Sequence, residues 1–303
     1  MRIQWPESRS GAEATPLRPL LILGAARSGT KFLRRLLAAH PACAVVPYGI
    51  PMVWRQGNEQ APHDALPAAR CSPSLASSIR KTITALARTD RPSAARWLVE
   101  KTCANTLRVP FVRRVFPHAR FIHMVRDGRD VAPSAYRRWT AAPSWTYRLR
   151  KATFLPASLM IRQGLQYAQR HRRTNDNRAT VWGPNYPGLQ EDLRHHGLAY
   201  ACVQQWVACV EAAQTALASV PAEHVLHLRY ETLVSDPHSL DRIASFLGMP
   251  DVDPMRAYYT ATLRRDTIGT GRALFQAEPW VSLRPLLART LDRVGYVAPS
   301  STT

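Results

Sequence analysis

The sequence feature that most constrains the fold is a short apolar run at residues 19–24, which ends in glycine and leads into a helical pattern. An uninterrupted apolar run of this length is typical of a strand that is buried on both faces of a sheet. In residues 31–40 the apolar side chains recur at the spacing of one helical face, and Pro41 ends the pattern. A buried strand, a glycine turn and a helix in this order predict the first unit of an α/β fold.

Three further stretches have the composition of short buried strands, at residues 96–101, 120–125 and 224–229. Helical patterns lie between and after them, at residues 74–88, 107–116, 199–220, 239–247 and 283–294. Alternating buried strands and helices predict a mostly parallel sheet that is flanked by helices on both faces. The sequence shows neither an internal repeat nor a linker, so we expect one domain over residues 17–297, with flexible ends at residues 1–16 and 298–303.

The charge of the chain is strongly positive: 41 Lys and Arg residues stand against 21 Asp and Glu residues, for a formal net charge of +20. Such a surface attracts anions, which include nucleic acids, phosphorylated cofactors and acidic glycans. A nucleic-acid-binding protein would also need a recognition helix or a basic platform with aromatic side chains, and the sequence shows neither motif. We therefore expect no nucleic-acid partner and look for a site that binds a smaller anion.

The cysteines and the first residues bear on the compartment. Five cysteines without a CxxC pair disfavour a structural zinc site and a disulfide framework, and they favour a reducing compartment. The first residues, MRIQWPESRS, lack the apolar core of a signal peptide, and residues 20–26 are too short to span a bilayer. Together with the Arg-, Ala- and Pro-rich composition, these features predict a cytoplasmic, bacterial protein without a membrane span.

The turn between the first strand and the first helix, residues 24–31, has the sequence GAARSGTK. A glycine turn at this place directs free backbone N–H groups and the positive end of the helix toward one point, where a phosphate can bind. The two glycines have the spacing of the nucleotide-triphosphate loop GxxxxGK[ST], so the turn is P-loop-like. Thr30, however, stands where that loop needs its lysine, and Lys31 stands where it needs the hydroxyl that binds Mg²⁺. The order of these two residues disfavours a nucleotide kinase or an ATPase.

A second candidate anion site follows the predicted strand at residues 120–125. This strand leads to Arg126, and Ser134 follows inside the next predicted helix. Because ligands of α/β proteins bind at the carboxyl ends of the strands, the guanidinium and the hydroxyl can converge on one anion. We expect Asp127 and Asp130 to pair with neighbouring arginines rather than to bind a metal.

Both segments, GxxRSGT followed by FLRRLLAAHP and the RDGRD turn with its Arg-to-Ser spacing, resemble the sulfotransferases that use 3'-phosphoadenosine 5'-phosphosulfate (PAPS). The resemblance is greatest to tyrosylprotein and bacterial carbohydrate-type sulfotransferases. Further matching segments are EKT at residues 100–102, RYETLVSDP at residues 229–237 and IGTGR at residues 268–272, and the resemblance extends over about residues 17–296. It implies an enzyme that transfers a sulfuryl group from PAPS to a hydroxyl or amine of an acceptor, by in-line displacement and without a metal.

The resemblance also assigns residues to the donor. The glycine turn would hold the 5'-phosphate, and Arg126, Ser134 and Arg138 would hold the 3'-phosphate. Tyr230 would contact the nucleotide. The residues that the resemblance assigns to cofactor binding are Arg27, Ser28, Gly29, Thr30, Lys31, Arg126, Ser134, Arg138, Tyr230 and Arg272.

The transferring group needs cations because negative charge builds on its oxygens and on the leaving oxygen. The resemblance assigns this role to Arg27 and Lys101. Two positions of the predicted donor site depart from the family pattern. Lys31 stands where the family usually has threonine, and Thr270 stands where lysine is frequent, so Arg272 is expected to substitute for that lysine.

The general base is the part of the predicted site that departs most from the family. Tyrosylprotein relatives carry a glutamate eight residues after the histidine of AHP, and this count leads from His40 to Tyr48. A tyrosine is a poor base near neutral pH. The next candidates are Glu59, then Asp64 and then His63. The missing glutamate keeps open the alternative of a non-catalytic, sulfotransferase-like nucleotide-binding protein.

Residues 140–197 are expected to cover the acceptor, which the sequence leaves open between a small molecule, a carbohydrate and a peptide. Four aromatic residues in this part of the chain could stack on a sugar or an aromatic acceptor, or could belong to the core: Trp145, Tyr147, Trp182 and Tyr186. The sequence carries no signal for the oligomeric state.

Overall fold

The computed structural model describes residues 16–88, 95–141, 181–264 and 266–296. Five strands in this part of the chain form one parallel sheet with the order β2-β3-β1-β4-β5. The strands are β1 (Arg18–Leu23), β2 (Cys43–Val45), β3 (Trp97–Glu100), β4 (Arg120–Val125) and β5 (Val225–Arg229). The chain order reverses at β1, which lies between β3 and β4, so the ligand crevice is expected at the carboxyl end of β1.

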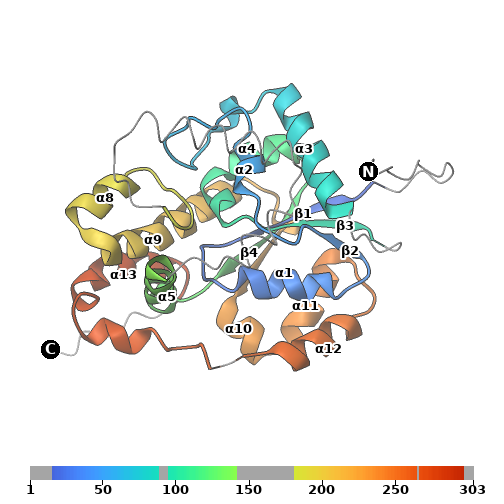
Figure 1. The fold of residues 1–303 in the computed structure, drawn as a ribbon. Helices are drawn as coiled ribbons and strands as arrows, with labels where there is room; N and C mark the ends of the chain where they lie inside the picture. Colours follow the sequence, from blue (N-terminus) through green and yellow to red (C-terminus); the bar gives the residue numbers. More distant parts are fainter. Residues whose placement is uncertain (1–15, 89–94, 142–180, 265, 297–303) are drawn as a thin grey trace, which may run out of the picture.

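Helices cover both faces of the sheet (Figure 1). The α-helices are α1 (Thr30–Ala38), α2 (Pro51–Trp54), α3 (Pro73–Arg88), α4 (Val109–Val115), α5 (Gly128–Thr140), α8 (Leu189–His195), α9 (Gly197–Leu217), α10 (Tyr230–Ser235), α11 (His238–Leu247), α12 (Asp253–Thr262) and α13 (Arg284–Arg293). The 3-10 helices are η1 (Ala68–Arg70), η2 (Cys103–Arg108), η3 (Ala222–His224), η4 (Arg272–Gln276) and η5 (Val281–Leu283). In Figure 1, α2, α3 and α4 lie above the sheet, and α1, α10, α11 and α12 lie below it.

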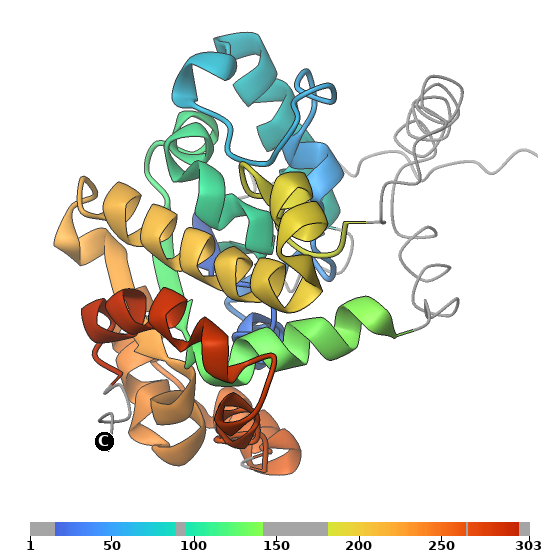
Figure 2. The ribbon, with the colours of Figure 1, turned by 90° about the vertical axis from the view of Figure 1, so that its left-hand side faces the viewer.

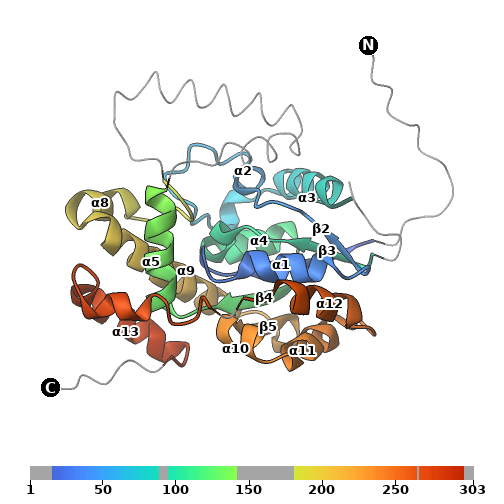
Figure 3. The same ribbon diagram turned by 60° about the horizontal axis from the view of Figure 1, so that its bottom comes forward.

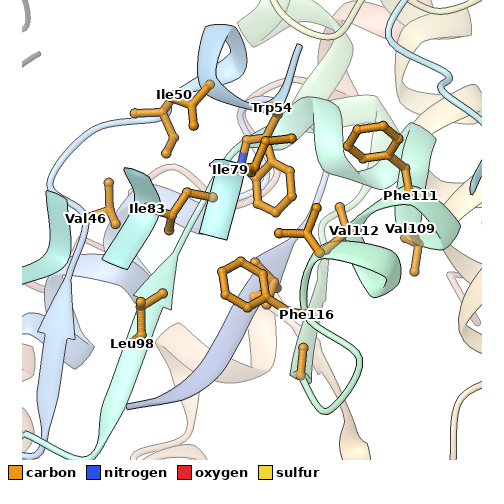
Figure 4. Close-up of a cluster of buried hydrophobic side chains, with 14 of the residues drawn as sticks. Val46, Ile50, Trp54, Ile79, Ile83, Leu98, Val109, Phe111, Val112 and Phe116 are labelled. Carbon is orange, nitrogen blue, oxygen red and sulfur yellow. The ribbon is translucent and has the colours of Figure 1, made fainter. Parts of the chain in front are cut away.

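Alternation along β1 explains why this strand is apolar at successive positions. Leu20 and Ile22 are buried in the core cluster that contains α1 and α11. Leu21 and Leu23 are buried in the cluster on the other face of the sheet. Figure 4 shows this second cluster, in which α2, α3 and α4 pack on the sheet. A strand with two covered faces needs apolar side chains on both of them.

A third cluster joins α5, α9 and α13 (Figure 2). Trp206 of α9 is buried, and its Nε1 donates to the Arg126 carbonyl oxygen, 3.1 Å away. Gly128, the first residue of α5, packs so closely on the Trp206 ring that a Cβ atom would lie 2.7 Å from it. These contacts fix the start of α5, and with it the turn that follows β4, against α9.

The α/β class, the single domain and the parallel sheet are confirmed, and the four predicted strands differ from the observed ones by no more than one residue at either end. The sequence does not predict β2, because three residues at the edge of a sheet carry too short a pattern. It also does not predict α2, α8, α10 and α12. No helix among the described residues combines the length and the apolar character that crossing a bilayer requires.

Candidate functional site

The glycine turn leads from the carboxyl end of β1 into α1. Gly24 has no room for a side chain, since a Cβ atom would lie 2.6 Å from the Met124 carbonyl oxygen of the neighbouring strand. Gly29 has a φ of +84° and lies against the Tyr230 ring, which would be 2.2 Å from a Cβ atom. Glycine is therefore required at both positions. Arg27 also has a left-handed φ, of 75°, which is uncommon outside glycine and marks the tightest part of the turn.

The turn presents hydrogen-bond donors that the protein itself leaves available. Among the described residues, no side chain caps the N-terminus of α1. The Ser28 hydroxyl is fully buried and has no hydrogen-bond partner within the described part of the chain. Buried hydroxyls are rarely left in this state unless a ligand or water completes them. Together with the positive end of the helix, these donors fit a phosphate group.

A cavity of about 310 Å³ lies beside the turn, between α5 and residues 267–270. Its lining residues are Arg27, Arg126, Asp130, Ser134, Arg137, Arg138, Ala141, Thr267 and Thr270. Four of them are arginines and one is an aspartate, so positive charge is in excess. Partial desolvation, followed by repulsion from Arg126 and Arg138, lowers the pKa of Arg27. Arginines that gather without matching carboxylates favour the binding of an anion. We call this space the arginine cavity.

Arg126 enters the arginine cavity from the end of β4. Its guanidinium lies over the Tyr230 ring, 4.5 Å from the ring centroid, and donates to the Thr267 carbonyl oxygen. Its Nε is buried without a hydrogen-bond partner among the described residues, so one donor remains for a ligand. Ser134 and Arg138 line the same cavity from successive turns of α5. The structure thus brings together the three residues that the sequence assigns to the 3'-phosphate.

Two predicted donor residues make contacts within the chain that the sequence does not predict. Arg27 is expected to reach the sulfuryl group, yet its Nε donates to the Ser134 hydroxyl, 2.9 Å away. Arg272 is expected to meet the nucleotide, yet it forms an ion pair with Asp127 at 2.9 Å, and Thr270 lines the cavity instead. The Asp127 carboxylate is fully buried, and a buried charge needs such cationic partners.

The two aspartates after Arg126 pair with arginines, as the sequence predicts. Asp127 pairs with Arg129 at 2.7 Å, and Asp130 lies 3.7 Å from Arg126. Both carboxylates are buried. Within the described ranges, no group of three or more His, Cys, Asp or Glu side chains is arranged to hold a metal ion.

Lys101 lies at the side of the glycine turn where α1 begins. Its Nζ is 3.9 Å from the Sγ of Cys103, which in turn is 3.7 Å from the Thr30 hydroxyl. A Cβ atom on Gly49, in the loop after β2, would lie 3.7 Å from the same Nζ. Lys31 is exposed on α1, and partial desolvation and nearby cations, among them Lys101, lower its pKa. The chain segments that follow β1, β2 and β3 therefore meet here.

Asp64, one of the three candidate bases, is held by a set of structural partners. Its Oδ1 accepts from Arg55 at 3.0 Å and from Arg108 at 3.4 Å, and its Oδ2 accepts from the Asn185 amide at 2.9 Å. Arg108 is fully buried, and burial lowers its pKa to about 10. The Asp64 carboxylate compensates the buried charge of Arg108. Both oxygens of Asp64 already accept hydrogen bonds from the protein, which makes it less suited to take a proton from a substrate.

The contacts of Asp64 continue to the residue that precedes Lys101. Arg108 Nε donates to Asn105 Oδ1 at 2.9 Å, and Asn105 Nδ2 donates to Glu100 Oε2 at 3.0 Å. Glu100 is fully buried, and burial raises its pKa. We call Asp64, Arg108, Asn105 and Glu100 the Asp64–Glu100 network.

Glu59 and His63 lie in the loop that follows α2. Both are half-buried, and their carbonyl oxygens accept from Arg55, at 3.4 Å and 3.0 Å. The described lining of the arginine cavity includes none of the three candidate bases. Tyr48 directly precedes Gly49, which lies beside the Lys101 side chain.

The aromatic residues of the expected acceptor cover differ in their surroundings. Tyr186 is 2% exposed and donates to Asp192 at 2.7 Å, so it is a core residue. Trp182 is half-buried and tilted against Trp139, with the ring centroids 6.4 Å apart. The other two predicted residues, Trp145 and Tyr147, lie outside the described residues.

Three residues of the site are not foreseen from the sequence. Arg137 and Thr267 line the arginine cavity, and Cys103 lies between Lys101 and the glycine turn. The pair of arginines in RRW is the signal that could have indicated Arg137, because both arginines follow the serine on the same helix. Thr267 and Cys103 reach the site through contacts between distant parts of the chain, which no local spacing indicates.

Comparisons with known proteins bear on the family and on the fold of the chain. A family model described as "Sulfotransferase family" matches residues 19–181 and 167–254. The solved sulfotransferase domain from the curacin biosynthetic pathway is 16% identical, with 94% of this chain and 100% of that chain covered and a TM-score of 0.53. At this identity the likeness bears on the fold alone.

Two further solved structures have lower TM-scores. A sulfotransferase from Alicyclobacillus acidocaldarius is 19% identical, with 94% of this chain and 98% of that chain covered and a TM-score of 0.47. Mouse sulfotransferase SULT7A1, complexed with PAP, is 13% identical, with 91% and 85% covered and a TM-score of 0.47. No curated protein matches the chain.

Proposed function

The chain belongs to the sulfotransferase family, and from that premise we propose that it transfers a sulfuryl group from PAPS to a hydroxyl or amine of an acceptor. The observation that carries the proposal is the arginine cavity beside the glycine turn. A donor with a phosphate at each end of its ribose needs two anion sites close together, and these two features meet that need.

In this proposal the arginine cavity takes the 3'-phosphate. Arg126, Ser134 and Arg138 would bind it, and the unpaired Nε of Arg126 supports this role. The glycine turn takes the 5'-phosphosulfate, with the buried Ser28 hydroxyl among its donors. Arg27 belongs to the turn by its backbone and to the cavity by its side chain, so it would contact the donor between its two phosphates.

The transfer itself is an in-line displacement, by analogy with phosphoryl transfer. The acceptor oxygen or nitrogen attacks the sulfur, the bond from sulfur to the 5'-phosphate oxygen breaks, and 3'-phosphoadenosine 5'-phosphate (PAP) leaves. Lys101 would neutralise charge on the sulfuryl and leaving oxygens, which its position beside Thr30 and Cys103 supports. The proton of the acceptor passes to a base of this chain.

We propose Glu59 as that base, with His63 as the next candidate. Asp64 is the weakest of the three in the proposal, because Arg55, Arg108 and Asn185 already donate to its carboxylate. The acceptor class stays open between a small molecule, a carbohydrate and a peptide. Position 48 carries tyrosine, and this observation favours a second candidate function, a non-catalytic protein that binds the same nucleotide.

The test is a calorimetric titration with PAP, beside a titration with ATP and Mg²⁺. Tight binding of PAP with little binding of ATP would support the donor assignment. Absence of PAP binding would overturn it and would return attention to a kinase or a nucleic-acid-binding protein. Release of PAP from PAPS in the presence of an acceptor then distinguishes the enzyme from the non-catalytic alternative.

A further inference from the structure

The connection from α12 to α13 passes the N-terminal end of α5 (Figure 3). Residues 267–271 of this connection lie at the arginine cavity. We propose that Asp130 is the positioning residue that holds this segment over the cavity and so completes the 3'-phosphate site. The inference rests on the proposed function, because it concerns the same donor site.

The contacts of Asp130 are unusual for a carboxylate near a phosphate. Its Oδ2 accepts from the Gly269 amide and its Oδ1 accepts from the Gly271 amide, each at 2.8 Å. Arg126 lies 3.7 Å from Oδ2. Two amides and a guanidinium compensate for the negative charge, so the carboxylate does not oppose an anion in the cavity.

The position of Asp130 in α5 explains why it is available for this task. It is the third residue of the helix, where an acidic side chain commonly reaches back to the amide of the N-cap residue. Here the N-cap amide, that of Asp127, donates instead to Glu231 Oε1 at 3.1 Å. Because Glu231 takes over this contact, both oxygens of Asp130 can bind the distant segment.

The segment itself is shaped for a close approach. A Cβ atom on Gly271 would lie 2.2 Å from the Arg129 carbonyl oxygen, so only glycine lets the two backbones meet. Gly269 has a φ of +77°, which glycine adopts without strain. These two glycines are the residues whose amides reach Asp130.

Docking of the segment places two groups at the cavity. Thr267 accepts from Arg126 through its carbonyl oxygen and meets the Tyr230 hydroxyl at 3.0 Å through its own hydroxyl. Thr270 lines the cavity. Without Asp130, the segment would lose its two amide contacts and Arg126 would lose its carboxylate partner. Both losses fall on groups that the proposed function assigns to the 3'-phosphate.

The experiment compares the wild-type protein with Asp130→Asn. The amide of asparagine would face one glycine N–H with its own NH₂ group, so one contact is lost and two donors oppose each other. We expect the peptide that spans residues 266–272 to exchange its amide hydrogens at least ten-fold faster in the unliganded variant, by mass spectrometry. We also expect PAP to bind at least ten-fold more weakly, while adenosine 5'-monophosphate, which lacks the 3'-phosphate, changes by less than about three-fold.

The matched control is Asp266→Asn, which removes a carboxylate from the same connection. The Asp266 side chain is 63% exposed and pairs with Arg264 at the surface, so both readouts should stay at the wild-type level. If Asp130→Asn does not fold, Gly271→Ala tests the same docking by its clash with the Arg129 carbonyl, without a change of charge.

Unchanged exchange in the segment would overturn the proposal, and so would equal losses of affinity for both nucleotides. Exchange is measured without ligand, so it reports on Asp130 even if the wild-type protein fails to bind PAP. That failure would remove the proposed donor, while faster exchange in the variant would still assign the docking of the segment to Asp130.

Discussion

The arginine cavity and the Asp64–Glu100 network are both built around arginines, and they differ in how the charge is balanced. In the network, Asp64 lies beside Arg55 and Arg108, and Glu100 is reached through Asn105. The described lining of the cavity has four arginines and one carboxylate, Asp130, and that carboxylate already accepts from two amides. The difference teaches that the charges of the network are matched within the chain, whereas positive charge is in excess along the described lining of the cavity, which supports the proposed anion site.

Burial gives the two regions different consequences. A buried arginine such as Arg108 needs its carboxylate, because removing one member of a buried pair leaves an uncompensated charge. At the cavity, Arg27 and Arg137 are exposed, keep part of their hydration and tolerate an excess of positive charge, whereas Arg126 is buried 3.7 Å from Asp130. Substitutions in the network should therefore affect stability, and substitutions in the cavity should affect ligand binding.

The largest effect should come from Glu59→Gln. Glu59 lies in the same loop as Asp64, and the substitution tests whether this loop supplies the proposed general base. Loss of a general base lowers turnover by about 10³-fold. PAP release is measured with any acceptor on which the wild-type enzyme turns over, and PAP affinity should be retained. The exposed Glu223→Gln is the matched control. Normal turnover in Glu59→Gln would remove Glu59 as the base.

Asp64→Ala should break the network and leave the donor site intact. The variant leaves Arg108 buried without its carboxylate, so the free energy of unfolding should fall by about 3 kcal/mol. Urea unfolding measures this, and Asp241→Ala, which removes a half-exposed surface ion pair, should change it little. A stable Asp64→Ala protein that has lost turnover would make Asp64 a catalytic residue. It would also contradict the assignment of the network to stability alone.

Arg126→Ala should have the opposite pattern. We expect PAP affinity to fall by about 100-fold, because a charged donor to the 3'-phosphate is lost. Isothermal titration measures the affinity, and the exposed Arg242→Ala should behave as wild type. Equal affinities in the two variants would remove the 3'-phosphate assignment.

Low pH should reduce the stability of the whole fold. The variants of the network and of the cavity are therefore best compared above pH 6.5. His123, on the strand that leads to Arg126, is buried, and burial followed by repulsion from His227 lowers its pKa to about 3. The folded state thus binds the proton less readily than the unfolded state, so stability is present above the ordinary pKa of about 6.5. It is lost as the pH falls toward 3, by about 1.4 kcal/mol per pH unit.

Urea unfolding between pH 7.5 and pH 5 measures this loss. His123→Phe removes the titrating group, so the variant should lose clearly less stability over the same range. An equally steep loss in His123→Phe would assign the acid sensitivity to other groups.

The smallest effect should come from Arg137→Ala. Arg137 is exposed at the arginine cavity, where water and salt screen its charge. We expect PAP affinity to fall by about five-fold at low salt and by less at 0.5 M salt, whereas the loss in Arg126→Ala should persist. An Arg137→Ala loss of affinity as large and as salt-independent as that of Arg126→Ala would show that the contribution of an arginine to PAP binding does not depend on its burial.

The parts of the molecule that the sequence predicts are those whose cause is local. The strands β1 and β4 are predicted because covered faces require apolar side chains, and the glycine turn is predicted because Gly24 and Gly29 have no room for a side chain. These requirements can be recognised from neighbours in the chain. The same holds for Ser134, which follows Arg126 within one strand-to-helix unit.

The remaining parts depend on contacts between distant residues. Asp64 resembles a candidate base because an acid stands in the right loop, but its partners Arg108 and Asn185 follow 44 and 121 residues later. The contacts of Asp130 with Gly269 and Gly271 also join distant parts of the chain, so the sequence does not predict the positioning role proposed for Asp130. Pairing energy and burial act in space, so a pattern along the chain cannot report them.

The distance between Asp130 and Gly271, 141 residues, also has a consequence for biosynthesis. A ribosome adds about 5–20 residues per second, so the turn after β4 is made roughly 7–28 s before the segment that docks on it. A nascent chain that ends between Arg138 and Thr267 contains the four arginines of the described lining and still lacks Thr267 and Thr270. Under the proposed function, stabilisation of the complete site by the nucleotide would begin only when translation has passed that segment.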